Sequence, residues 1–310
     1  MTKLRASLES FRRWLEHRCL PMHVALLAVL ICVPSLWLGW VADDHLLRLR
    51  LSVPHLFPDW QGSPLNLFTF VAGDVNLNQR LIADGILPWW TDPEVRFAFF
   101  RPLSGLSHWI DNLLWPESPW LAHLHSLLWL AAAVAAATVL YRRLLGVGWI
   151  AGLAALLFAL DDSHAFPAMW IANRNSTISV VFALLAVLAH DAWRQREGRG
   201  WAVVAPAALA IGLLGGEMAI AAGAYILAYA LFLDDAHWKG RLASLIPCTV
   251  TGLLWGLTYS AMGFGVSGSG LYIDPLADPT RFGAAVIERA PLLLMGLWSL
   301  PPDLHLLISE

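Results

Sequence analysis

The chain has 310 residues, of which 58% are hydrophobic and only 14% are Asp, Glu, Lys or Arg, against about 25% charged residues in a soluble domain. Together with a mean hydropathy of +0.59 and long uncharged runs, this excludes a water-soluble domain, a disordered chain and a nucleic-acid-binding protein. The net charge of −3 is too small to indicate a polyanionic partner. Cys19, Cys32 and Cys248 lack the spacing of a disulfide framework or a zinc site.

The apolar runs predict an all-α, multi-pass membrane helix bundle of about eight spans, because about 20 apolar residues are needed to cross a bilayer. The first run follows a basic tail but is longer than the apolar part of a signal peptide, so we interpret it as an anchor. The predicted spans lie near residues 21–41, 119–140, 146–160, 176–190, 201–215, 218–233, 242–262 and 283–300.

Lys and Arg are unevenly distributed between the two sets of connecting segments. The segments 1–21, 141–147, 191–200 and 234–241 hold 12 basic residues in 46 positions, whereas 43–118, 161–175 and 263–282 hold 7 in 111. Basic loops face the cytoplasm in membrane proteins. We therefore expect both ends of the chain in the cytoplasm, in a protein of the cell (inner) membrane.

Residues 43–118 form one long external loop within a single membrane domain, 1–310. Seven prolines divide it into short pieces: Pro54, Pro58, Pro64, Pro88, Pro93, Pro102 and Pro116. Extended loops on a rigid scaffold often carry function. The alternative is an insertion that the fold merely tolerates.

Asp43 and Asp44 directly follow the first predicted span. Adjacent carboxylates repel one another, so the pair could bind a divalent cation or accept a proton. The spacing is equally compatible with a helix that simply ends in water.

Other polar residues lie at the same predicted face. Arg101 precedes His108 and Asp111, which share a face if this piece is helical. His123 and His125 point to different helix faces and do not form a joint metal site. Further along come His164, Arg174 and Glu217.

Glu217 lies in an apolar stretch, which favours a buried carboxylate with a partner over a short external turn. The histidines are more simply interfacial hydrogen-bonding residues than metal ligands. As a group, these polar residues fit either a site for a lipid with an anionic headgroup or the vestibule of a transporter.

The order of several short motifs resembles the GT-C glycosyltransferases that use lipid-phosphate sugars, most closely the branch of protein O-mannosyltransferase-like enzymes, some of which carry tetratricopeptide repeats. The motifs are Asp43-Asp44-His45, Phe100-Arg101-Pro102-Leu103, His123-Leu124-His125, Leu157-Phe158-Ala159-Leu160 before Ser163-His164, Trp170-Ile171-Ala172-Asn173-Arg174-Asn175 and Gly216-Glu217-Met218-Ala219.

The resemblance implies an acidic residue of the first external loop as base or metal contact, which would be Asp43 or Asp44. It also implies that Arg101, His164 and Arg174 line the region of the donor phosphate, with His123, His125 and Glu217 at the same site. The partners would be a polyprenyl-phosphate-linked sugar, an acceptor protein or glycan, and membrane lipid. Such enzymes usually have more spans, so the resemblance leads us to expect an N-terminal fragment, a reduced relative or an inactive homologue.

The reaction expected from this resemblance is inverting sugar transfer to an acceptor hydroxyl on the external face. Two alternatives remain open: a non-enzymatic transporter or envelope-assembly partner with a polar vestibule, and a flippase-like or ligase-like protein that handles lipid-linked glycans. A divalent cation is compatible with the acidic pair, and no other cofactor is indicated.

Overall fold

The computed structural model describes residues 2–53, 63–270, 272–275 and 277–297. Pro54, Pro58 and residues 298–300 of the last predicted span lie outside this part, as do Met1 and the last ten residues. The described chain is mostly helical and divides into two compact units, 1–70 with 98–265 and 71–97 with 266–310.

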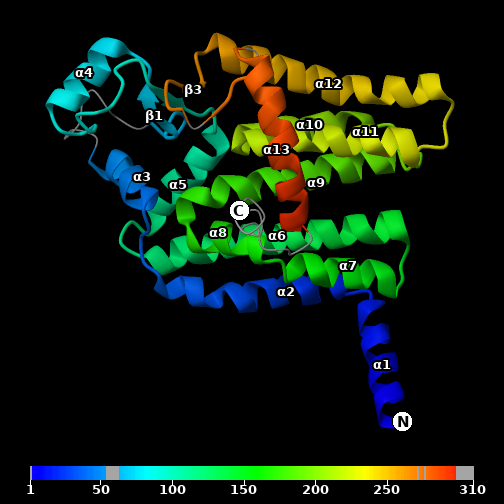
Figure 1. The fold of residues 1–310 in the computed structure, drawn as a ribbon. Coiled ribbons are helices and arrows are strands. Elements are labelled where there is room, and N and C mark those ends of the chain that lie inside the picture. The colour runs from blue at the N-terminus through cyan, green and yellow to red at the C-terminus, as the bar shows by residue number, and fades with distance from the viewer. Residues whose placement is uncertain (1, 54–62, 271, 276, 298–310) are drawn as a thin grey trace, which may run out of the picture. The chain divides into compact units, whose positions relative to one another are not determined.

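The first unit is a bundle of helices (Figure 1). Its elements are α1 (Thr2–Leu15), α2 (Leu20–Cys32), η1 (Val33–Trp37), α3 (Asp43–Ser52), α5 (Pro102–Leu114), α6 (Pro119–Leu145), α7 (Trp149–Ala159), η4 (Asp162–His164), α8 (Ala165–Met169), η5 (Ile171–Asn173), α9 (Arg174–Arg194), α10 (Trp201–Gly215), η6 (Glu217–Ala221), α11 (Ala222–Phe232) and α12 (Trp238–Ala261).

The second unit contains α4 (Val75–Ala83) and α13 (Pro279–Leu297). Three short strands, β1 (Thr69–Ala72), β2 (Arg96–Ala98) and β3 (Gly265–Ser267), form a sheet in the order β1-β2-β3 where the chain passes from one unit to the other. The sequence analysis did not predict this sheet. Three- and four-residue strands are too short to show an alternating pattern.

Four helical segments of the described chain are long and apolar enough to cross a membrane: Leu20–Trp37, Pro119–Leu145, Ile171–Arg194 and Trp238–Ala261. α7 and the segment Asp162–Met169 make a fifth if this pair, bent by 43°, is one broken span. Helices α10 and α11 are apolar but shorter. These segments indicate a membrane protein with four or five spans by length and composition, and the count of eight stays a prediction.

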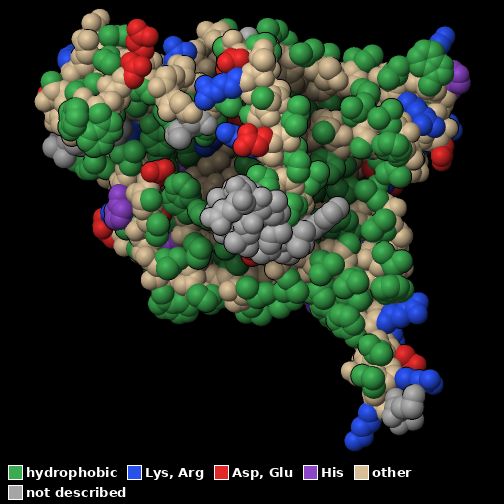
Figure 2. Space-filling model, viewed as in Figure 1, with side chains coloured by type: hydrophobic (Ala, Val, Ile, Leu, Met, Phe, Trp, Pro, Cys, Tyr) green, Lys and Arg blue, Asp and Glu red, His purple; other side chains and the backbone are tan. Residues whose placement is uncertain are grey.

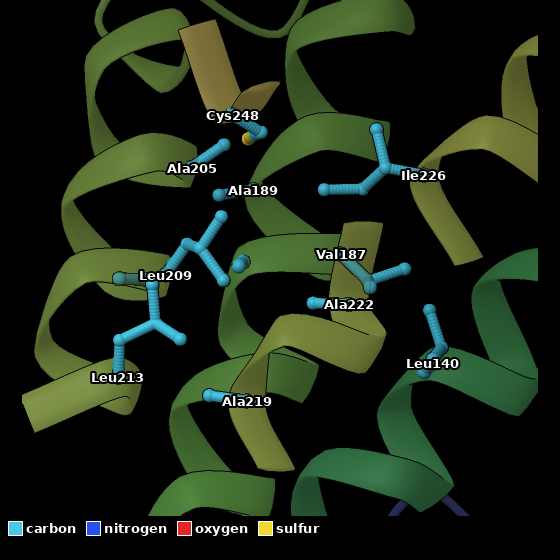
Figure 3. Packing of buried hydrophobic residues seen from close by; sticks show 12 residues of the cluster. Leu140, Val187, Ala189, Ala205, Leu209, Leu213, Ala219, Ala222, Ile226 and Cys248 are labelled. Carbon is cyan, nitrogen blue, oxygen red and sulfur yellow. The ribbon is translucent and has the colours of Figure 1, made fainter. Parts of the chain in front are cut away.

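The main apolar cluster of the bundle lies between α9, α10, α11 and α12, with Leu140 of α6 at its edge. Figure 3 shows the leucines of α10 packed against small residues, among them Ala189 of α9 and Ala222 of α11. Small side chains let helices approach closely, which is how helix pairs gain packing energy in a bilayer. A second cluster joins α2, α6, α7 and α8.

Helices α6 and α9 run parallel and are bonded to each other near both ends. Arg174 Nε donates to Ser126 Oγ near their first turns, and Arg143 Nε donates to Asp191 Oδ2 near their last turns. Both pairs are separated by 48 residues in the sequence. The two contacts therefore hold the helices in one register.

Within the first unit, segments with few basic residues meet at one end of the bundle, and the basic segments meet at the other. Asp44 of α3 bonds to Ala172 of η5, and Arg101 pairs with Glu217, at the first end. At the opposite end, Arg142 bonds to the Leu15 and His17 carbonyls. We call these the acidic end and the basic end. Their side of a membrane remains the prediction made from the charge pattern.

Candidate functional site

Helix α5 carries a buried polar stripe at the acidic end. Pro102 occupies its first turn, where a missing N–H costs no hydrogen bond. Ser104, Ser107, His108 and Asp111 follow at helical spacing and are all buried. Ser104 Oγ donates to the Gly215 carbonyl at 2.6 Å. The stripe thus faces the bundle, in agreement with the prediction that His108 and Asp111 share a face.

Arg174, at the first turn of α9, lies with its guanidinium fully buried beneath this stripe. It donates to Ser126 Oγ and Ser107 Oγ, each at 2.9 Å, and to the Ala122 carbonyl at 2.7 Å. Its Nη1 lies 2.6 Å from Asp111 Oδ2. A buried charge needs such partners because desolvation is costly. Arg174 therefore ties three helices together.

His125 shares Asp111 with Arg174. The His125 Nδ1 atom lies 2.7 Å from Asp111 Oδ1 and 3.2 Å from Arg174 Nη1, while Trp129 donates to its Nε2. The acceptor role of Nε2 requires the proton on Nδ1, which points at the carboxylate. A carboxylate that fixes an imidazole in this way holds it in one tautomer and orientation.

Asp44 is buried and ties the start of α3 to η5. Its Oδ2 accepts a hydrogen bond from the Val41 N–H at 2.9 Å, and its Oδ1 accepts one from the Ala172 N–H at 2.6 Å. Burial raises the pKa of Asp44 above its ordinary value, although these bonds and nearby His123 oppose the rise. Arg174 also lies within electrostatic range. Asp44 is thus a carboxylate whose proton affinity is increased by its surroundings.

Asp43 differs from its neighbour. It is half-buried, and no hydrogen bond to its carboxylate is found within the described part of the chain. Partial burial raises its pKa. Ala42 before it has a φ of +47°, a strained conformation for a residue with a Cβ atom.

A small cavity opens beside Asp44. Its volume of about 20 Å³ is room for about one water molecule. The wall is formed by Trp40, Asp44, Leu47, Arg48, Leu51, His108, Asp111, Asn112, Pro116 and Ile171. The buried Nε2 atom of His108 has no hydrogen-bond partner in the described chain. Burial first, and then nearby Arg174 and His125, hold the pKa of His108 well below its ordinary range.

Arg101 lies at the N-terminus of α5, partly exposed, over the ring of Phe99 at 4.2 Å. Its Nε donates to Glu217 Oε2 at 2.7 Å, and Tyr259 donates to the other Glu217 oxygen at 3.3 Å. No partner for the two Nη groups is found among the described residues. Glu217 thus has the partner that the sequence predicted, but it is not the buried carboxylate that was favoured: it is partly exposed and lies at the turn between α10 and η6. Arg101 keeps donors for a further anion.

His123 and His164 have bonds to backbone carbonyls. Fully buried His123 of α6 contacts the carbonyls of Gly39, which follows η1, and of Ala168 in α8. His164 Nε2 contacts the Phe158 carbonyl at 2.6 Å, across the bend after α7. His164 lines a separate, mainly apolar pocket of about 310 Å³ together with residues such as Phe166, Asn173 and Met218.

The structure brings Asp44, His125 and Arg174 around the α5 stripe, with Asp43 beside them. Arg101 and Glu217 form a second pair at the same end of the bundle, and His164 belongs to the other pocket. The sequence analysis placed His108 and Asp111 on one face but gave them no individual role, and it did not name Ser107. Their i, i+1 and i+4 spacing in an apolar helix is the signal that identifies them. The hydroxyl of Ser126 gave no comparable signal.

Within the described residues, no group of three or more His, Cys, Asp or Glu side chains is placed to hold a metal ion. Both oxygens of Asp44 already accept N–H groups, which a cation would have to face.

Comparison with known proteins gives no relative. No family model, curated protein or solved structure matches the chain.

Proposed function

We propose that the chain is a membrane glycosyltransferase that transfers a sugar from a polyprenyl-phosphate donor to an acceptor hydroxyl at the acidic end of the bundle. The observation that carries the proposal is the gathering there of an acidic pair with raised pKa values, a buried Arg174–Asp111–His125 cluster and an arginine with uncommitted donors. The motif resemblance supplies the reaction class. The long apolar helices would keep the donor's lipid tail in the membrane.

In this proposal the acceptor oxygen attacks the anomeric carbon as the bond from that carbon to the phosphate oxygen breaks. The hydroxyl proton passes to Asp43 or Asp44, and polyprenyl phosphate leaves with inversion at carbon. Asp44 lines the cavity, whereas Asp43 is the more accessible carboxylate. A raised pKa brings a carboxylate closer to the pH at which a general base is most effective.

Arg101 is our candidate for the contact with the donor phosphate. Its Nη groups can form paired hydrogen bonds to phosphate oxygens, the geometry for which guanidinium is suited. Arg174 has a different task. Its fully buried guanidinium already bonds to Ser126, Ser107, Asp111 and the Ala122 carbonyl, so it orients the cluster and does not touch the donor.

A proton-coupled transporter is the main competing interpretation, with Glu217 as the proton carrier. The ion pair with Arg101 and the bond from Tyr259 argue against it, because they occupy both carboxylate oxygens. A carrier needs a carboxylate that is free to exchange its proton with solvent.

The test is incubation of the purified full chain with radiolabelled polyprenyl-phosphate sugars and candidate hydroxyl acceptors. We expect transfer by the wild type, and loss of transfer in Asp43→Asn or Asp44→Asn without loss of the folded state. Arg101→Gln should weaken donor binding. Full transfer by both aspartate variants and by the double variant would contradict the proposed base.

Arg143→Gln is the matched control for Arg101→Gln. It removes a partly exposed arginine that is ion-paired with Asp191 and Glu197 at the basic end. It should reduce stability but leave donor affinity unchanged. Equal losses of donor affinity in the two variants would show that Arg101 acts only through the fold.

A further inference from the structure

Helix α1 at the N-terminus presents an uncovered apolar stripe. Leu4, Leu8, Phe11 and Leu15 are spaced by four, three and four residues, so they lie on one helix face. Leu15 is buried, but Leu4, Leu8 and Phe11 remain 68%, 58% and 45% exposed. Three large apolar side chains in a row, on one face, need a partner.

The direction of this stripe is fixed by its last member. Leu15 packs so closely against Gly152 of α7 that a Cβ atom at Gly152 would clash with the Leu15 carbonyl. The other three residues of the stripe share the helix face of Leu15, so the stripe faces the side on which Leu15 meets α7. A bilayer around the candidate spans would lie on that side of α1.

The helix also has the right inclination for a membrane surface. Figure 1 shows α1 projecting from the basic end of the bundle and running across the direction of α2, α6 and α7. The corner is held by stacked rings, Phe11 on Trp14 at 5.9 Å and Trp14 on His23 at 6.3 Å. If α2 and α6 cross a bilayer, α1 lies parallel to its surface.

The charge of α1 is suited to anionic lipid. Lys3, Arg5, Arg12 and Arg13 oppose a single Glu9 within the helix. Lys3, Arg5 and Arg12 flank the apolar stripe, where long side chains can reach lipid headgroups while their stems stay at the apolar boundary. Figure 2 shows Lys and Arg side chains together with hydrophobic ones along this projecting helix.

We propose that α1 is an interfacial helix that lies on the leaflet at the basic end. Its stripe of Leu4, Leu8 and Phe11 inserts at the boundary between headgroups and acyl chains, and its basic residues bind anionic headgroups. Apolar insertion combined with basic flanks is the pattern of helices that bind anionic membranes in the surface plane. This inference does not depend on sugar transfer.

The test uses the full chain, reconstituted into vesicles of phosphatidylcholine with or without phosphatidylglycerol. In a background of Cys19→Ser, Cys32→Ala and Cys248→Ala, a single cysteine replaces Leu8 or, as the matched control on the opposite face, Ser10. Each carries an environment-sensitive fluorophore. We expect a blue shift and quenching by lipid-borne quenchers at position 8, and neither at position 10.

The charge requirement is tested by Lys3→Gln with Arg5→Gln. The part of the blue shift that phosphatidylglycerol adds should fall at least about twofold in this variant, while Lys3→Arg leaves it unchanged. Equal solvent exposure at positions 8 and 10 would overturn the proposal. A shift at position 8 that depends on protein concentration, with energy transfer between labelled chains, would also overturn it by assigning the stripe to a second copy.

Discussion

Arg174 is the fully buried cation of the candidate site, and its burial is stable only while its counter-charge is present. Arg174→Met should destabilise the protein by about 3–5 kcal/mol, because Asp111 would remain buried without its counter-charge. The double variant with Asp111→Asn should recover part of this loss, since it removes the uncompensated charge. Chemical denaturation in detergent micelles measures both. Additive losses in the double variant would contradict the coupling between the two residues.

His108 makes stability depend on pH. Its pKa is lowered by burial first and then by Arg174 and His125, so between the folded and unfolded pKa values the unfolded chain binds the extra proton. Stability from this group is therefore present above an ordinary histidine pKa and is lost as the pH falls below about 6.5, by at most about 1.4 kcal/mol per pH unit.

The measurement is the free energy of unfolding of wild type and His108→Gln between pH 7 and pH 5. We expect a flatter pH dependence in the variant. His237→Gln, which removes an exposed histidine at the basic end, should keep the wild-type slope. Parallel curves for wild type and His108→Gln would show that another group causes the pH dependence.

Asp44 makes a separate prediction for the rate of sugar transfer. A base acts in its ionised form, and burial raises the pKa of Asp44 from an ordinary value of 3.8. The rate should therefore fall on acidification with a midpoint above that value. Initial rates across the acidic range test this, and a midpoint at or below the ordinary value would argue against Asp44 as the base.

Residue patterns in the sequence predicted which residues belong to the candidate site better than they predicted the role of each residue. Charge in an apolar context singled out Glu217, and the motif resemblance indicated Arg174. Whether a guanidinium is fully bonded, as at Arg174, or has donors to spare, as at Arg101, depends on contacts between residues 48 and 116 positions apart. Such contacts arise only when the helices pack, so no local pattern contains them.

At the scale of elements, α5 can pack closely against the segment at Pro64 because residue 105 is a glycine, which has no Cβ atom. A Cβ atom at Gly105 would clash with the Pro64 carbonyl. Gly105→Ala should destabilise the protein by about 1–3 kcal/mol, although alanine favours a helix.

Gly256→Ala in α12 is the control for this prediction, since a Cβ atom there meets nothing within 4 Å. It should be neutral or stabilise the protein by up to about 1 kcal/mol. Thermal unfolding of both variants in micelles gives the comparison. Similar melting temperatures for the two variants would mean that the chain at Pro64 can shift to make room for the Cβ atom without loss of stability.

Helices were the most predictable elements. Each apolar run of the sequence overlaps a helix of the structure, because a continuous run of that length has few other ways to satisfy its backbone in a membrane. The bend after α7 was less predictable. The 43° break at residues 160–161 depends on how Asp161 bonds to the Ser163 N–H and His164 to the Phe158 carbonyl.

At the scale of the whole molecule, orientation is open to a direct test. Glu117 at the acidic end and Glu197 at the basic end are both exposed partners of arginine, Arg48 and Arg143. In the cysteine-free background, Glu117→Cys should react with an impermeant maleimide from outside the cell, and Glu197→Cys only after the membrane is opened. The reverse pattern would invert the topology, and labelling of both from outside would contradict a crossing between them.

The two contacts that join α6 to α9, one near each end, limit how these helices can move relative to each other. Sliding either helix by a single turn would separate Arg174 from Ser126 and the Ala122 carbonyl, and Arg143 from Asp191, in one movement. Any transport cycle in which α6 slides along α9 would have to break both contacts each time. We therefore expect α6 and α9 to keep their relative position when a ligand binds or leaves. Movements that open the site would then occur in the short elements around this pair.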